Sequence, residues 1–257
     1  MAPPDRSHER SRSFGQIAAD YNRFRPAPPD DAVDALLPPG ASDVLEIGAG
    51  TGLLTRMLIM RAAHVLALEP DARMRVVLAD TTPEAEILAG TAEEIPVPDA
   101  SCDAVIASSA WHWVDEERAA PEVARVLRSG GCFSLLWNGP DRNVEWMRSL
   151  WEGGKALGEE ETQAVDTQRR ERHVVTLPPD SPFAEPERWS TRWTVPMTKE
   201  ELVGLAATYS RVITMDEAAR QDYLGSVRHF LDTNEELATK VMIDVPMRCL
   251  CWRTTRL

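Results

Sequence analysis

The feature that most constrains this chain is the stretch VLEIGAGTG at residues 44–52, where a short apolar run leads into three alternating glycines. Glycine loses more backbone entropy on folding than other residues, so such a cluster indicates a backbone or a close approach that side chains would prevent. A strand that turns directly into a helix needs this backbone, and α/β sheets bind ligands at the carboxyl ends of their strands. The stretch therefore predicts an α/β fold with a ligand at residues 48–52.

The residues around this stretch alternate between strand-like and helix-like patterns. Strands are expected at residues 44–47, 65–69, 85–89, 102–108 and 132–137. Helices are expected at residues 51–61, 72–78 and 117–127, and Gly130 and Gly131 are expected to end the last of them. Short strands with two apolar faces are typical of a parallel sheet that is covered by helices on both sides.

The flanking residues predict further helices within a single domain at 13–257. Residues 1–12 are expected to form a flexible tail, and residues 13–40 to contain two short helices. The periodicity weakens over an insertion at 139–187, where helices are expected at 144–157 and 162–172. A strand at 188–195, helices that begin at Thr198 and Asp216, and a strand at 241–253 complete the chain; Glu201 has capping-box spacing from Thr198.

The charge of the chain argues against a nucleic-acid partner. Lys and Arg number 28 against 41 Asp and Glu, which gives a formal net charge of −13. An acidic protein repels phosphate backbones unless it carries a basic patch, and the densest basic run, residues 169–172, is interrupted by Glu171. The N-terminus has no apolar stretch typical of a signal peptide, and no run of about 18 apolar residues indicates a membrane span.

The cysteines favour a reduced, cytoplasmic protein without a metal. Cys102, Cys132, Cys249 and Cys251 form no CxxC pair, so a zinc site is not indicated. Cys249 and Cys251 share one face of a predicted strand, which suits buried free thiols. No grouping of Asp and Glu has the spacing of metal ligands.

Two cofactor classes compete for the glycine-rich loop. The dinucleotide fingerprint GxGxxG requires a small third residue, where this chain has Leu53. The observed pattern instead places Glu46 two residues before the first glycine, and a carboxylate there suits a ligand with an amino group. Glu69 ends the second predicted strand, where an acid accepts hydrogen bonds from ribose hydroxyls.

These residues resemble motif I of class I methyltransferases, which use S-adenosylmethionine. The segment GTAEEIPVPDASCDAVIASS at residues 90–109 is similar to the adenine-binding region of that superfamily. The stretches FGQIAADYNRFRP, AWHWVD, LLWN and LVGLAATYSRV resemble the type 11 subgroup, which includes small-molecule enzymes related to trans-aconitate methyltransferase. The resemblance covers roughly residues 13–256.

The resemblance implies a seven-stranded Rossmann-like sheet, an N-terminal lid within 13–40 and a helical cap at 139–187. It implies that Thr91 and Ala92 lie along the adenine edge. Arg25 either pairs with the methionine carboxylate or is a solvated side chain on an amphipathic helix. The residues expected to bind the cofactor are Tyr21, Arg25, Glu46, Gly48, Ala49, Gly50, Thr51, Gly52, Glu69, Pro70, Thr91, Ala92, Glu93, Ser108 and Ser109.

Acceptor residues are expected beyond the fourth and fifth strands and in the insertion. His112 is the candidate general base, because its pKa range suits proton removal from a hydroxyl or an amine; the alternative is a histidine that orders its loop. Its neighbouring tryptophans either stack on a flat acceptor or seal the core. The substrate candidates are Trp111, Trp113, Trp137, Asn138, Trp146, Tyr209 and Arg211.

The expected function is methyl transfer to a small, partly apolar metabolite, with oxygen favoured over nitrogen or carbon as the acceptor atom. Two alternatives stay open at this point. One is a methyltransferase that acts on protein or nucleic acid, and the other is an accessory module that binds the cofactor without turnover.

Overall fold

The computed structural model describes residues 14–152 and 175–257 and divides them into two compact units. The sheet unit comprises residues 27–138, 175–191 and 249–257, and the helical unit comprises residues 14–26, 139–152 and 192–248. The predicted tail at 1–12 and the predicted helix at 162–172 lie outside the described residues. The predicted lid segment 13–40 is divided between the two units.

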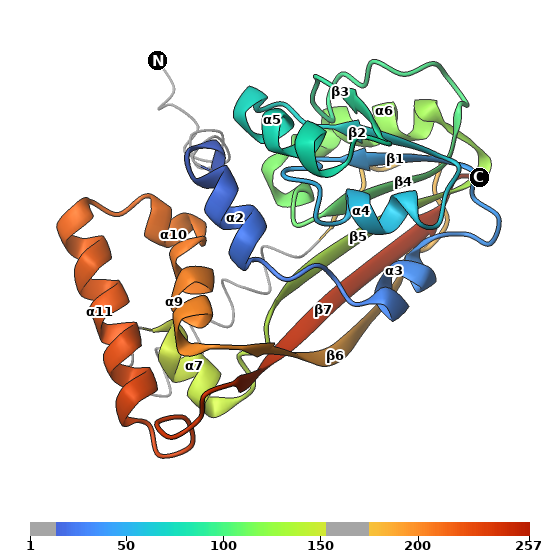
Figure 1. The fold of residues 1–257 in the computed structure, drawn as a ribbon. Coiled ribbons are helices and arrows are strands. Elements are labelled where there is room, and N and C mark those ends of the chain that lie inside the picture. Colours follow the sequence, from blue (N-terminus) through green and yellow to red (C-terminus); the bar gives the residue numbers. More distant parts are fainter. Residues whose placement is uncertain (1–13, 153–174) are drawn as a thin grey trace. The chain divides into compact units, whose positions relative to one another are not determined.

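One seven-stranded sheet carries the fold, in the order β3-β2-β1-β4-β5-β7-β6 (Figure 1). Its strands are β1 (Asp43–Ile47), β2 (His64–Leu68), β3 (Glu86–Leu88), β4 (Cys102–Ser108), β5 (Leu127–Pro140), β6 (Glu187–Met197) and β7 (Ile243–Thr255). β1 pairs in parallel with β2 and β4, β2 with β3, and β4 with β5. The prediction of a seven-stranded Rossmann-like sheet is confirmed.

The sheet is mixed rather than wholly parallel, because β7 runs opposite to β5. The Gly130 N–H donates to the Arg256 carbonyl at one end of this pair, and the Asp141 N–H donates to the Pro246 carbonyl at the other. Residue numbers thus rise along β5 while they fall along β7. The parallel arrangement predicted from strand–helix alternation holds for β1 to β5 only.

Helices occur where they are predicted within the described residues, although α4 begins at Thr55 rather than at residue 51. They are η1 (Phe14–Ile17), α2 (Ala18–Phe24), α3 (Asp30–Leu36), α4 (Thr55–Ile59), α5 (Ala72–Thr81), η2 (Trp111–Trp113), α6 (Glu116–Val126), α7 (Glu145–Trp151), α9 (Lys199–Ala207), α10 (Ser210–Ile213) and α11 (Glu217–Thr233). The capping box between Thr198 and Glu201 is present, and Asp216 caps α11 by accepting the Ala219 N–H.

Helices cover both faces of the sheet unit, as predicted. Successive residues of β1 point to opposite faces, so Val44 packs with α3 and α4 while Leu45 packs with α6. Figure 1 shows α4 and α6 on opposite sides of β1 and β4. This double burial explains why the central residues of the parallel strands are mostly apolar.

α6 ends within one residue of its predicted end at residue 127, but the prediction that Gly130 and Gly131 end it is wrong. The helix ends at Val126, and Leu127 already has extended angles and begins β5. Gly130 has a φ of +78° inside this strand, where its N–H pairs with β7. Pairing with β7, which is far away in sequence, therefore extends β5 back to the end of α6. Gly130 and Gly131 belong to β5.

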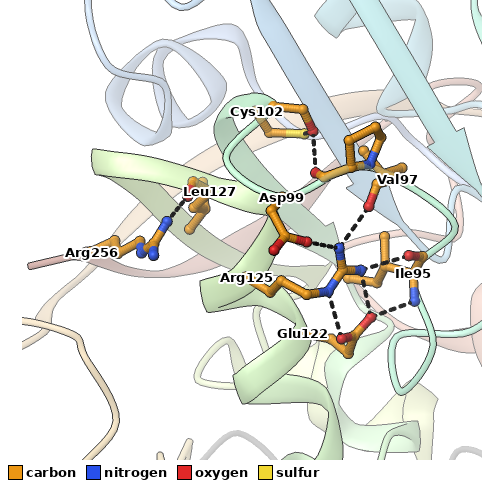
Figure 2. A network of polar contacts seen from close by, with 10 residues as sticks. Ile95, Val97, Asp99, Cys102, Glu122, Arg125, Leu127 and Arg256 are labelled. Atoms are coloured by element: carbon orange, nitrogen blue, oxygen red, sulfur yellow. Dashed lines mark hydrogen bonds and ion pairs between the residues drawn. The ribbon is translucent and has the colours of Figure 1, made fainter.

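The guanidinium of Arg125 fixes the segment that connects β3 to β4. Figure 2 shows it surrounded by acceptors: it donates to the carboxylates of Glu122 and Asp99 and to the carbonyls of Ile95 and Val97, over 2.7–2.8 Å. Glu122 also accepts the Ile95 N–H at 2.9 Å. Three contacts from Arg125 and one from Glu122 thus attach to α6 a segment that has little regular structure of its own.

We expect Arg125→Met to lower the free energy of unfolding by about 1–3 kcal/mol, because two carbonyls and two carboxylates lose a charged donor. Urea denaturation measures this change. The control is Arg118→Met, the same substitution at an exposed position of the same helix, where we expect a change within about 0.5 kcal/mol. Equal losses in the two variants would contradict the anchoring role of Arg125.

Candidate functional site

The candidate site lies at the carboxyl edge of the parallel strands in the sheet unit. Because β1 to β5 are parallel, the residues that follow each of them meet at one edge. The predicted residues that lie there are 48–52, Glu69, Pro70, 91–93, Ser108, Ser109, 111–113, Trp137 and Asn138. Sequence reasoning from strand ends therefore brings most of its candidates to one place.

Two of the three loop glycines are explained by contacts within the protein. Gly48 has a φ of +67°, and a Cβ there would lie 2.5 Å from the Cβ of Ala110. A Cβ on Gly52 would lie 2.9 Å from the side chain of Thr82, at the end of α5. Gly50 also has a positive φ of +60°, but a Cβ there would meet nothing within 4 Å. Only Gly50 thus leaves an open approach to the backbone, as a ligand requires.

The carboxylate of Glu69 joins the loop to the end of β2. One of its oxygens accepts the Gly50 N–H and the other accepts the Asp71 N–H, each at 2.8 Å. Burial raises the pKa of Glu69, while these two N–H donors oppose the rise. Each carboxylate oxygen can accept more than one hydrogen bond, so the group keeps capacity for hydroxyl donors of a ligand.

Glu46 of β1 is enclosed by protein. Its side chain is 1% exposed, and Oε2 accepts the hydroxyl of Thr55 at 2.6 Å. Burial raises its pKa to about 8, so the group is mainly a neutral acid at pH 7. In this structure Glu46 therefore fastens the first residue of α4 to β1.

The end of β4 is strained where it meets the loop. Ser109 has a φ of +53°, which is uncommon for a residue with a Cβ, and its N–H donates to the Leu136 carbonyl at 2.8 Å. This turn carries the next residue, Ala110, against Gly48. Ser108 and Ser109 are both half-buried at this edge.

The predicted adenine segment is tied to the loop before α6. Glu93 accepts the Asp115 N–H at 2.9 Å, and a short bridge pairs Thr91 with Glu94. Thr91 is exposed, whereas Ala92 is buried in the core. These contacts fix the position of the segment but do not test its assignment to adenine.

The aromatic residues after β4 fall into two groups. Trp111 is 1% exposed and packs edge-on against Phe133, so the structure places it in the core rather than on an acceptor surface. His112 is exposed, and its ring lies 4.5 Å from that of Trp113. The indole N–H of Trp137, at the end of β5, donates to Nδ1 of His112 at 3.3 Å.

The remaining candidates differ in how far they are buried by the rest of the protein. Ala49 and Thr51 are buried, and the Thr51 carbonyl accepts the hydroxyl of Thr81. Pro70 is exposed. The amide of Asn138 donates to the Ala27 carbonyl at 3.2 Å.

Five candidates belong to the helical unit: Tyr21, Arg25, Trp146, Tyr209 and Arg211. The Arg25 guanidinium lies 3.6 Å from the ring centre of Tyr209 and donates to the hydroxyl and carbonyl of Thr208. In this structure the Arg25 guanidinium is thus held by residues 208 and 209 of the same unit.

Arg211 and Trp146 also contact residues of the helical unit. Arg211 donates to the hydroxyl of Tyr223 at 2.9 Å and faces Glu152 at 3.4 Å. Trp146 is half-buried against the core of the helical unit.

Sequence reasoning missed three residues that build the site: Thr55, Asp71 and Ala110. Asp71 could have been found, because an Asp directly before a helix predicts an N-cap, and it accepts the Arg73 N–H in that role. Thr55 and Ala110 act through contacts with β1 and with Gly48, for which the local pattern has no signal.

No cluster of three or more His, Cys, Asp or Glu side chains suited to a metal ion occurs among residues 14–152 and 175–257. In the same ranges, none of the helices combines the length and apolar character needed to cross a membrane. All four cysteines are free and buried, as predicted for Cys249 and Cys251, whose sulfurs lie 3.9 Å apart.

We expect Glu46→Gln to change the pH dependence of stability. The folded-state pKa of Glu46 is raised from its ordinary value to about 8, so this acid stabilises the fold fully below pH 4.5 and loses that contribution as the pH rises toward 8. The neutral glutamine has no such loss, so the variant should gain stability relative to the wild type between pH 5 and 8. Parallel stability curves from urea denaturation across this range would contradict a buried neutral acid.

Comparison with known proteins agrees with this geometry. Residues 45–135 match the model of a methyltransferase domain family. The chain is 42% identical over 245 residues to an uncharacterized methyltransferase from Mycobacterium tuberculosis, which covers 95% of this chain and 96% of the relative.

A partial relative and a solved structure add to this comparison. A malonyl-[acyl-carrier protein] O-methyltransferase from Methylococcus capsulatus is 35% identical over 150 residues, or 54% of each chain. The fold resembles that of a putative type II methyltransferase from Anaeromyxobacter dehalogenans, with a TM-score of 0.62 at 22% identity over 91% of this chain and 98% of the other.

The structure thus has the glycine loop, the acid after β2 and the strand order. The sequence is 42% identical to a methyltransferase over 96% of that relative's length. This enzyme belongs to the class I methyltransferase family, whose cofactor is S-adenosylmethionine.

Proposed function

We propose that this enzyme transfers a methyl group from S-adenosylmethionine to an oxygen atom of a small, partly apolar metabolite. The observation that carries the proposal is the pairing of Glu69 with Gly50, which puts a buried carboxylate beside an open backbone approach at the edge of the sheet. The cofactor supplies a methyl group that its sulfonium makes strongly electrophilic. The protein's own task is then to position the acceptor and to exclude water.

The residues at this edge fit the cofactor. The remaining acceptor capacity of the Glu69 carboxylate suits the two hydroxyls of a ribose. The open side of Gly50 suits an amino-acid tail, because a side chain there would occupy the space that the tail needs. Ser108 and Ser109, at the end of β4, are small and half-buried, which suits the reacting end of the cofactor.

The acceptor class is inferred from the residues that follow. Trp113 and His112 offer a partly exposed aromatic surface directly after β4, which suits a flat or apolar molecule. The similarity to a malonyl-[acyl-carrier protein] O-methyltransferase supports oxygen as the acceptor atom. The net charge of −13 disfavours nucleic acid as the acceptor.

Incubation with S-adenosylmethionine and a small-molecule extract tests this proposal by mass spectrometry. We expect a metabolite that gains the mass of one methylene group, together with formation of S-adenosylhomocysteine. Methylation of protein or nucleic acid in the same extract would favour a macromolecular substrate. Tight cofactor binding with no product from any extract would favour an accessory module without turnover.

We expect Glu69→Gln to weaken S-adenosylmethionine binding about 10- to 100-fold, because a neutral amide accepts weaker hydrogen bonds and turns its NH₂ toward one N–H donor. Isothermal titration calorimetry measures this loss. Glu94→Gln is the matched control, since this exposed carboxyl lies outside the proposed contacts, and it should retain wild-type affinity. Unchanged affinity in Glu69→Gln would remove Glu69 from the cofactor site.

A further inference from the structure

The contact between Trp137 and His112 restricts the chemistry that His112 can perform. Trp137 is 7% exposed at the end of β5, and its Nε1 lies 3.3 Å from Nδ1 of His112. An indole nitrogen carries a hydrogen and can only donate, so Nδ1 must be the acceptor of this hydrogen bond. A neutral imidazole with an acceptor at Nδ1 carries its single hydrogen on Nε2.

This assignment conflicts with a general base at position 112. A base needs an unprotonated nitrogen that faces the acceptor, but the unprotonated Nδ1 lone pair of His112 is directed at Trp137. The other nitrogen already carries a hydrogen. His112 could remove a proton only after it had given up the hydrogen bond from a nearly buried tryptophan.

We propose that Trp137 is a positioning residue that holds His112 as the neutral Nε2–H tautomer, so that His112 serves the acceptor as a hydrogen-bond donor. Its partner on the substrate is then an oxygen that can accept, such as a carbonyl or carboxylate near the methylated atom. This role deepens the proposed function and rests on it. The tautomer itself rests only on the contact with Trp137.

The packing around the imidazole supports a fixed orientation. η2 presents His112 between its two tryptophans, and the Trp113 ring lies against it at an interplanar angle of 45°. Trp111, on the other side of His112 in sequence, is anchored in the core against Phe133. The turn that carries His112 is therefore held by the buried Trp111. The hydrogen bond from Trp137 decides that Nδ1 of His112 faces the indole.

Nitrogen NMR of the full chain with ¹⁵N-labelled histidine tests the tautomer without any acceptor. At a pH where the imidazole is neutral, we expect Nδ1 of His112 to give a pyridine-type signal and Nε2 a pyrrole-type signal; the signals are assigned by their loss in His112→Gln. Trp137→Phe should shift the signals toward a mixture of tautomers. A pyridine-type Nε2 in the wild type would overturn the inference even if the variant failed to fold.

Trp113→Phe is the matched control for the spectra. It makes the same substitution in the other tryptophan beside the ring, which lies tilted at 45° to the imidazole with the ring centres 4.5 Å apart. We expect the wild-type tautomer in this variant. A shift equal to that of Trp137→Phe would mean that packing, and not the indole donor, selects the tautomer.

Three substitutions at position 112 test the donor role by methyl incorporation into the same small-molecule extract. The amide nitrogen of glutamine reaches the place of Nε2, whereas that of asparagine reaches the place of Nδ1. We expect His112→Gln to retain activity within about tenfold and His112→Asn and His112→Ala to lose about 10- to 100-fold.

Equal losses of about 1,000-fold in all three variants would favour a base and overturn the donor role. Wild-type activity in all three would overturn it as well. If the wild type methylates nothing in the extract, the proposed function fails, while the nitrogen spectra still decide whether Trp137 fixes the tautomer.

Discussion

The hydrogen bonds of one carboxylate, that of Glu69, connect the elements on which the site depends. Its oxygens accept N–H groups from Gly50, in the loop after β1, and from Asp71, which begins α5. Two adjacent β–α connections are thereby joined at a single buried group. Burial alone would favour the neutral acid, and the two donors offset part of that cost. The same arrangement leaves the Gly50 backbone open, so cohesion of the fold and access for a ligand arise from one interaction.

The two acids of the glycine motif have different physical roles although they lie on neighbouring strands. Glu46 is enclosed, has only the Thr55 hydroxyl as a partner in the contacts seen here, and is mainly neutral. Glu69 is stabilised by backbone donors and can accept more hydrogen bonds. A buried neutral acid with a hydroxyl partner serves packing of α4 on β1, because no uncompensated charge is buried. The two acids thus differ in burial and in remaining acceptor capacity, a difference that the sequence pattern does not show.

The sequence predicts well what is determined locally. The bounds of β4 and the caps at Thr198 and Asp216 match, because strand alternation and capping depend on neighbouring residues. The glycine pair at 130–131 was misassigned, because pairing with β7, more than 100 residues later, decided where β5 begins. The sequence predicts the position of the glycine loop but not why each glycine is needed. Gly48 and Gly52 lie too close to Ala110 and Thr82 to carry a Cβ, and these contacts have no signal in a local pattern.

The role of His112 illustrates the same limit in chemical terms. Its pKa range allows a base, a donor or a packing residue, and the sequence WHW does not distinguish among them. What distinguishes them is a group 25 positions away in the chain, since Trp137 can only donate and so requires a lone pair on the imidazole nitrogen that faces it. A reaction whose methyl group is already activated needs alignment more than proton removal. A histidine fixed as a donor supplies alignment, and an oxygen-bearing acceptor is the kind of molecule that it can align.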